Sequence, residues 1–176
     1  AGMGSEQGIA DTKGAIYRGV CSAGVAVINA DSPYAGQWQA QSRAARVLRA
    51  SASGPADVWA GDIDASADGL AFELHVQQGS CPVRMQVPGR HNAANAVLAA
   101  AAAEAAGAPL EAIARGLGRV APAAGRLRRV VARGGAQLFD DTYNANPGSM
   151  RAAIDVLAAC SGRRVLVMGD MAELGD

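Results

Sequence analysis

The sequence is poor in aromatic residues and carries no excess of either charge. Phe, Trp and Tyr together make up 4% of the 176 residues, and alanine stands at many positions that leucine or isoleucine could occupy. The 16 basic residues balance the 16 acidic ones, so the formal net charge is zero. This balance argues against nonspecific binding to nucleic acid or to an anionic membrane, and we expect neither partner.

Cysteines and long apolar runs are also scarce. The three cysteines, Cys21, Cys81 and Cys160, include no pair at the short spacing of a zinc site. Their odd number and wide separation argue against a disulfide framework and favour free thiols in a reducing, cytoplasmic compartment. The most apolar run, 93–103, is well short of the ~20 residues that span a bilayer, so we expect no membrane insertion.

The length and the two ends of the chain indicate a piece of a larger protein. Half of the residues are apolar, which is enough for a packed core, and the length fits one domain or parts of two. No initiator methionine precedes Ala1, and Asp176 follows a turn that leads toward further structure. We therefore expect an internal fragment.

The hydropathy pattern predicts an α/β protein with parallel and antiparallel strands. The apolar run 25–28 is typical of a buried parallel strand. Segments 58–65, 70–77 and 82–87 alternate like an antiparallel meander. A linker at 120–125 precedes a new strand–helix unit, so we expect two parts, 1–121 and 122–176. The expected helices are 5–17, 34–42, 92–106, 110–118 and 147–159, and the remaining strands are 45–49, 127–132, 137–140 and 165–168.

The segment 88–95 is the first that could carry chemistry. Pro88 and Gly89 end a strand, and Asn92 is expected to cap the helix that follows. Asn95 lies one turn further on, where its carboxamide can both donate to and accept from the N6/N7 edge of an adenine. Two asparagines at a helix start need no ligand to explain them, so capping alone remains open as the alternative.

The segment 139–147 carries two adjacent acids, Asp140 and Asp141, from a strand into a polar loop. Neighbouring carboxylates repel each other unless a cation or hydrogen-bond donors use their charge. Asn146, which is followed by proline, is a good helix N-cap and is explained without a ligand. Capping explains neither the acidic pair nor Tyr143, so a binding site is favoured here.

Two further features are weak evidence for a functional site when taken by themselves. The segment 168–175 follows another apolar run, at a place where α/β folds put ligands. Lys13 falls on a polar helix and, from the residues alone, is an ordinary surface lysine.

In this order and spacing, the three loops resemble the Mur ligase family of ATP-dependent ligases. The run Tyr143-Asn144-Ala145-Asn146-Pro147 is the most specific match, because sister ligases carry different residues after the acidic pair. The resemblance covers nearly the whole chain. The matching stretches are 3–5, 13–16, 29–31, 89–95, 125–126, 140–150 and 169–175.

The resemblance implies the second half of a P-loop-type central ATP-binding domain, followed by the start of a Rossmann-like carboxy-terminal domain. It implies that ATP phosphorylates the carboxylate of UDP-N-acetylmuramoyl-tripeptide and that the amine of D-alanyl-D-alanine attacks the acyl phosphate. The resulting amide belongs to cytoplasmic peptidoglycan precursor synthesis. Magnesium would shield the phosphate charges, and the full-length enzyme is expected to be a monomer.

Three residues receive catalytic or nucleotide-binding roles from the resemblance. Lys13 matches a lysine that is carbamylated and then holds magnesium through an anionic oxygen. Arg126 matches an arginine that reaches the ATP phosphates and takes part in catalysis. Asp141 matches a residue that binds the ribose.

The remaining implied contacts are to adenine and to the incoming dipeptide. Asn95 matches the residue that contacts adenine, with His91 and Asn92 nearby. The residues that the resemblance places near D-alanyl-D-alanine are Tyr143, Asn144 and Asn146.

The chain also departs from the family pattern. No Gly-x-x-Gly-Lys-Thr phosphate loop occurs in the 176 residues, and a magnesium-binding histidine of the family should fall just before Ala1. We therefore expect this piece to be inactive alone. Two alternatives stay open: a sister ligase that adds a different amino acid, and a noncatalytic binding module with the same fold.

Overall fold

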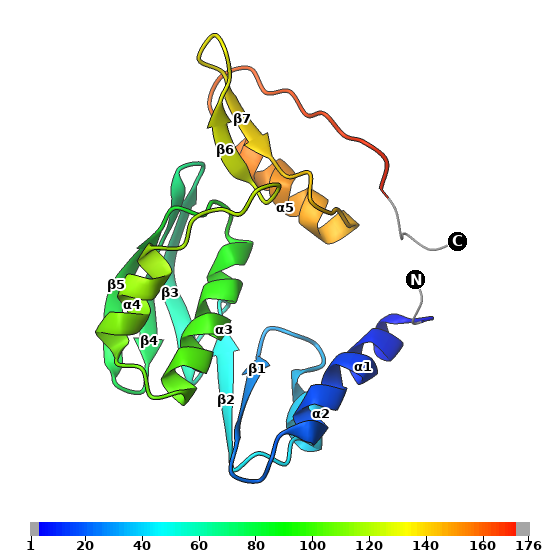
Figure 1. Ribbon diagram of the computed structural model, residues 1–176, viewed down its shortest axis with the longest axis vertical. Coiled ribbons are helices and arrows are strands. Elements are labelled where there is room, and N and C mark those ends of the chain that lie inside the picture. Colours follow the sequence, from blue (N-terminus) through cyan, green and yellow to red (C-terminus); the bar gives the residue numbers. More distant parts are fainter. Residues whose placement is uncertain (1–3, 172–176) are drawn as a thin grey trace.

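The computed structural model describes residues 4–171, so Met3 and the second half of the predicted loop 168–175 lie outside the described residues. The chain contains both helices and strands, as predicted for an α/β protein (Figure 1). The elements are α1 (Glu6–Gly19), β1 (Val25–Asn29), α2 (Ala35–Gln41), β2 (Arg46–Ser51), β3 (Val58–Ser66), β4 (Gly69–Val76), β5 (Gly79–Met85), α3 (His91–Ala105), α4 (Leu110–Gly118), β6 (Arg128–Val131), β7 (Gln137–Asp140) and α5 (Pro147–Ala158).

The first five strands form one sheet in the order β1-β2-β3-β4-β5. The pairs β1–β2 and β2–β3 are parallel, whereas β3–β4 and β4–β5 are antiparallel. The ladder between β2 and β3 is short and pairs Ala50 with Val58 and Ser51 with Trp59. The predicted combination of parallel strands with an antiparallel meander is therefore confirmed.

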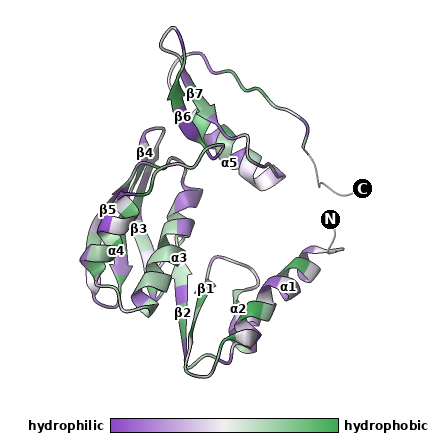
Figure 2. Ribbon diagram, viewed as in Figure 1, coloured by the Kyte–Doolittle hydropathy of each residue, from purple (hydrophilic) through white to green (hydrophobic). Residues whose placement is uncertain are grey.

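Helix α3 covers one face of this sheet and reaches across both of its halves. It packs against β1, β2, β3 and β4, and α4 lies beside it against β5. Its buried positions are mostly alanines, which lets the helix lie close to the strands. The large buried side chains come mainly from the strands, with Ile28, Leu48 and Leu74 at no more than 1% exposure. Figure 2 shows that α3 is hydrophilic in its first turns, near α5, and mostly apolar over the rest of its length.

The turn between β3 and β4 depends on a glycine for steric reasons. Gly69 has a φ of +154°, and a Cβ at this position would lie 2.2 Å from the carbonyl oxygen of Met85. Gly79, at the next turn of the meander, has a φ of +135° but open space around it. The second glycine is therefore required only by its backbone conformation.

A smaller unit follows the linker and consists of the antiparallel pair β6–β7 and helix α5. The predicted strand at 165–168 is wrong, because these residues are irregular and their side chains are 45–89% exposed. An apolar run becomes a strand only when another strand pairs with it, and none does so within residues 4–171. Among the helices of that same range, none combines the length and the hydropathy needed to cross a membrane.

Candidate functional site

A cleft of about 510 Å³ lies where the start of α3 meets the linker and the start of α5. Its lining brings together residues that are far apart in the sequence, from Val87 to Ala152. Six of the predicted site residues line it: His91, Asn92, Asn95, Arg126, Asp141 and Asn144. Three separate stretches of sequence therefore converge on one site.

The approach to α3 is shaped by Gly89. Its φ is +94°, a backbone conformation that favours glycine, and a Cβ would lie 2.6 Å from Cε1 of His91, so a larger residue would be strained and would displace the imidazole. The helix begins at His91 with Arg90 as its N-cap, and the Arg90 side chain makes no capping hydrogen bond. The expectation that Asn92 caps this helix is wrong, because the chain turns into the helix before Asn92.

The two asparagines of α3 form a pair at the cleft. The Asn92 side chain reaches back and donates from Nδ2 to the carbonyl oxygen of Pro88 at 2.7 Å. Its Oδ1 accepts from Nδ2 of Asn95 at 3.0 Å. Asn92 thereby orients the Asn95 amide and leaves Oδ1 and one N–H of Asn95 free for a ligand.

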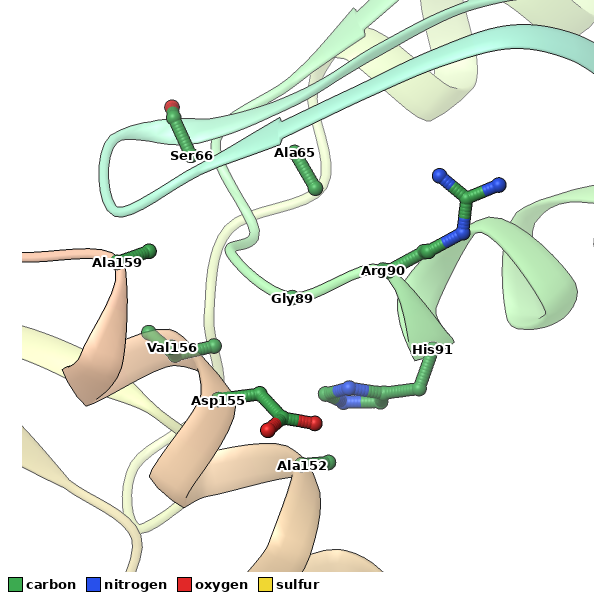
Figure 3. Close-up of a pocket in the computed structure, with 9 residues that line it drawn as sticks. All are labelled: Ala65, Ser66, Gly89, Arg90, His91, Ala152, Asp155, Val156 and Ala159. Carbon is green, nitrogen blue, oxygen red and sulfur yellow. The ribbon is translucent and has the colours of Figure 1, made fainter.

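The imidazole of His91 lies between the cleft and a second cavity of about 280 Å³ under α5. Figure 3 shows the ring pointing toward the carboxylate of Asp155, with Ala152 beside it. Displacement of water lowers the pKa of His91 below its usual 6.5, and the charge of Asp141 acts in the opposite direction. The first effect prevails, so the ring is neutral at pH 7 although its outer edge remains exposed.

Acidification is expected to lower the stability of the protein through His91. Because the pKa of the folded imidazole is depressed, the unfolded chain binds more protons between that pKa and 6.5. The free energy of unfolding should therefore fall as the pH drops through 6.5 and level off below the folded pKa. Urea unfolding at several pH values in this range should show that the free energy of unfolding depends on pH. His91→Asn should reduce this dependence, whereas the control His75→Asn should leave it unchanged. An unchanged dependence on pH in His91→Asn would contradict this assignment.

The acidic pair binds backbone donors of the linker. Asp140 accepts from Oγ1 of Thr142 at 2.7 Å and from the N–H of Gly125 at 3.3 Å. Asp141 accepts from the N–H of Leu127 at 3.1 Å. The hydrogen bond from Thr142 is the main cause that lowers the pKa of Asp140. Both carboxylates therefore have donors in the protein itself, and they tie the linker to the loop after β7.

Arg126 extends from this tied linker into the cleft. Its Cζ lies 4.3 Å from the centroid of the Tyr143 ring. The N–H of Tyr143 donates to the carbonyl oxygen of Gly125 at 3.0 Å, which brings the two segments into direct contact.

Three predicted site residues lie elsewhere. Asn146 caps α5 in a reciprocal arrangement with Ser149, so the capping interpretation of this residue is confirmed. The Tyr143 side chain contacts Arg126 but does not line the cleft. Lys13 is exposed on α1 and lines a separate cavity of about 290 Å³ with Glu6 and Tyr34.

Some cleft residues were not predicted. Pro122 was interpreted only as part of the linker, and Leu127 only as the first residue of a strand. Leu127 is 5% exposed and has a φ of +51°, which is unusual for leucine and shows how tightly this segment is held. The contact between Arg129 on β6 and Asp68 at the β3–β4 turn was also missed. The leucine directly after Arg126 was the available signal for Leu127, and no local signal existed for the ion pair.

Comparison with known proteins relates the chain to one family over both of its parts. The Mur ligase middle domain family matches residues 2–103, and the family described as Mur ligase, glutamate ligase domain, matches residues 125–176. A UDP-N-acetylmuramoyl-tripeptide–D-alanyl-D-alanine ligase of Escherichia coli K12 is 43% identical over 175 residues, covering 99% of this chain and 39% of the relative. A ligase of the same name from Mycobacterium tuberculosis H37Rv is 41% identical over 184 residues, covering 99% and 36%.

Solved structures agree with this relationship. A crystal structure of MurF from Acinetobacter baumannii superposes with a TM-score of 0.92 at 38% identity, covering 99% of this chain and 38% of that chain. A MurF ligase from Thermotoga maritima in complex with ADP has a TM-score of 0.75 at 19% identity, covering 92% and 36%, and supports the fold alone. The chain thus spans about two-fifths of the length of the curated relatives it matches.

Proposed function

Because this chain belongs to the Mur ligase family, we propose that its cleft binds ATP for an amide ligase that joins UDP-N-acetylmuramoyl-tripeptide to D-alanyl-D-alanine. The observation that carries the proposal is the convergence of an amide pair, an arginine and a carboxylate on one cleft of about 510 Å³. This volume lies within the roughly 300–1,000 Å³ typical of small-molecule sites. The domain division in the proposal is 1–121 for the central domain and 122–176 for the carboxy-terminal one.

The polar side chains of the cleft suit the three parts of ATP, which are adenine, ribose and the phosphates. Asn95, whose amide is oriented by Asn92, can pair with the adenine edge, and the neutral ring of His91 lies beside it. Asp141 keeps one carboxylate oxygen free to accept from a ribose hydroxyl. Arg126 provides a permanent positive charge and several N–H donors for the phosphates.

The proposed reaction passes through an acyl phosphate, and the positive charge of Arg126 lies in the cleft where the phosphates would bind. In the proposed reaction the tripeptide carboxylate attacks the γ-phosphorus of ATP and ADP leaves. The amine of the dipeptide then attacks the acyl carbon, loses a proton, and phosphate leaves as the amide forms. Arg126 would balance the negative charge that shifts among the phosphate oxygens. Asn144 lines the same cleft and could meet the incoming dipeptide, whereas Tyr143 and Asn146 lie on the same loop outside the lining of the cleft.

The described residues offer few ligands for a magnesium ion. Within residues 4–171, no three His, Cys, Asp or Glu side chains gather in a way that could hold a metal ion. A carbamate on Lys13 would add one anionic oxygen ligand, and Lys13 is the only lysine among the 16 basic residues of the sequence. All the other basic residues of the chain are arginines, which provide positive charge but no nucleophilic amine. A lysine at position 13 is therefore consistent with a need for its amine.

The proposal also includes a cytoplasmic, monomeric full-length enzyme. The three cysteines are free thiols in the structure, which is consistent with a reducing compartment. The two curated relatives at 43% and 41% identity both carry the name of the dipeptide-adding ligase, which favours this activity over that of a sister ligase.

The direct test of the proposal is nucleotide binding followed by ligation. ATP should bind the full-length protein in titration calorimetry, and this protein should consume ATP only when both UDP-N-acetylmuramoyl-tripeptide and D-alanyl-D-alanine are present. Consumption of ATP with a single free amino acid in place of the dipeptide would favour a sister ligase. Absence of ATP binding would favour a noncatalytic module.

Asn95→Leu is expected to raise the apparent KM for ATP by roughly fivefold or more, since a hydrogen bond to adenine contributes about 1 kcal/mol. The turnover number should change little, because adenine is remote from the reacting phosphoryl group. Steady-state kinetics at varied ATP, with Asn95→Asp as the variant that keeps the acceptor oxygen, measures this. Unchanged ATP kinetics in Asn95→Leu would remove Asn95 from the site.

A further inference from the structure

Arg126 is held in the cleft by an aromatic ring instead of a carboxylate. The Tyr143 centroid lies 4.3 Å from Cζ of the guanidinium. Over residues 4–171, the guanidinium forms neither an ion pair nor a side-chain hydrogen bond. One flat face of the group is therefore covered while its N–H edges stay free.

The carboxylates of Asp140 and Asp141 bind main-chain donors beside Arg126 and not its guanidinium. Asp140 accepts the N–H of Gly125, and Asp141 accepts the N–H of Leu127. These two donors belong to the residues on either side of Arg126. A carboxylate paired with the guanidinium would occupy the donors that a phosphate needs, whereas a ring under its face occupies none of them.

The position of Tyr143 is set by its backbone. Its N–H donates to the carbonyl oxygen of Gly125 at 3.0 Å, and a Cβ on Gly125 would lie 2.9 Å from the nitrogen of Tyr143. Gly125 also has a φ of +70°, so this close approach requires glycine. The Tyr143 side chain itself is 68% exposed, and core burial therefore does not explain an aromatic residue at this position.

We propose that Tyr143 is a positioning residue whose ring holds the Arg126 guanidinium by one face and leaves its N–H groups to the phosphates of ATP. This inference rests on the proposed function and deepens it. It differs from the contact with D-alanyl-D-alanine that the family resemblance implies for Tyr143.

The experiment compares ATP with adenosine, which lacks the phosphates, in titration calorimetry on the full-length protein. Tyr143→Leu should weaken ATP binding roughly three- to tenfold, as expected for loss of a partly exposed cation–π contact. Adenosine binding should stay unchanged, which also shows that the fold is intact. Tyr143→Phe keeps the ring and should bind ATP as the unmodified protein does.

A double-mutant cycle and the dipeptide kinetics complete the test. In an Arg126→Ala background, Tyr143→Leu should cause no further loss of ATP affinity. The KM for D-alanyl-D-alanine should be the same in Tyr143→Leu and the unmodified protein. The assignment is overturned if Tyr143→Leu raises only that KM, if Tyr143→Phe loses as much ATP affinity as Tyr143→Leu, or if the loss persists without Arg126. Failure of the unmodified protein to bind ATP would overturn the proposed function itself, and with it this assignment.

Discussion

Lys13→Ala in the full-length ligase is expected to reduce turnover by ~10³-fold or more. Removal of a group that stabilises charge in the transition state typically has an effect of this size. The side chain lines a cavity beside Glu6 and Tyr34, is exposed, and has no ion-pair partner within the described part of the chain. An exposed and unpaired amine is open to reaction with carbon dioxide. The loss in Lys13→Ala would follow from removal of the carbamate and its anionic oxygens.

Lys13→Arg is the matched variant, because it keeps the positive charge but cannot form the carbamate. It should be as inactive as Lys13→Ala, while added formate or acetate should partly restore turnover in the alanine variant by replacing the missing carboxylate. Carbon-13 NMR with labelled bicarbonate gives a readout besides activity, since the carbamate resonance should vanish in Lys13→Arg. Full turnover in either variant would rule out the proposed role of Lys13.

Gly69→Ala is expected to lower the free energy of unfolding by about 3–5 kcal/mol, among the largest effects of a single substitution. The new Cβ would lie 2.2 Å from the carbonyl oxygen of Met85, so the backbone of β4 or β5 must move. The pairing of Leu70 with Met85 leaves little freedom for such a shift.

Gly79→Ala is the matched control for this prediction. Both glycines have positive φ, but the space around Gly79 is open, so the control isolates the conformational cost of about 1 kcal/mol. Urea unfolding of the two variants should give clearly different losses. Equal losses would show that steric contact with Met85 is not what requires glycine at position 69.

Local sequence patterns were enough for most of the fold. The alternation along β3, β4 and β5 and the apolar run of β1 predicted both halves of the sheet, because side-chain periodicity reflects the face that each strand buries. The segment 165–168 shows the limit of this reasoning, since hydropathy indicates a tendency to be buried and pairing requires another strand.

Residue types indicated which loops could carry a site, but not the contacts within it. The loops around Asn95 and Asp141 were recognised from residue type, and the structure places both on one cleft. The family resemblance, and not the residues themselves, supplied the roles of Lys13 and Arg126, which remain proposals. The hydrogen bond from Leu127 to Asp141 could not be predicted, because it depends on how two segments that are distant in sequence meet.

The short ladder between β2 and β3 has a consequence for how the protein folds. Neighbouring strands of the meander can pair early, since their contacts are local, whereas the parallel strands must first close long loops. Two residue pairs alone couple these halves through the sheet, so most of the coupling passes through α3, which packs on both. Weakening the packing of α3 would therefore change the character of unfolding: a single cooperative transition would split into two, with the β1–β2 half lost first.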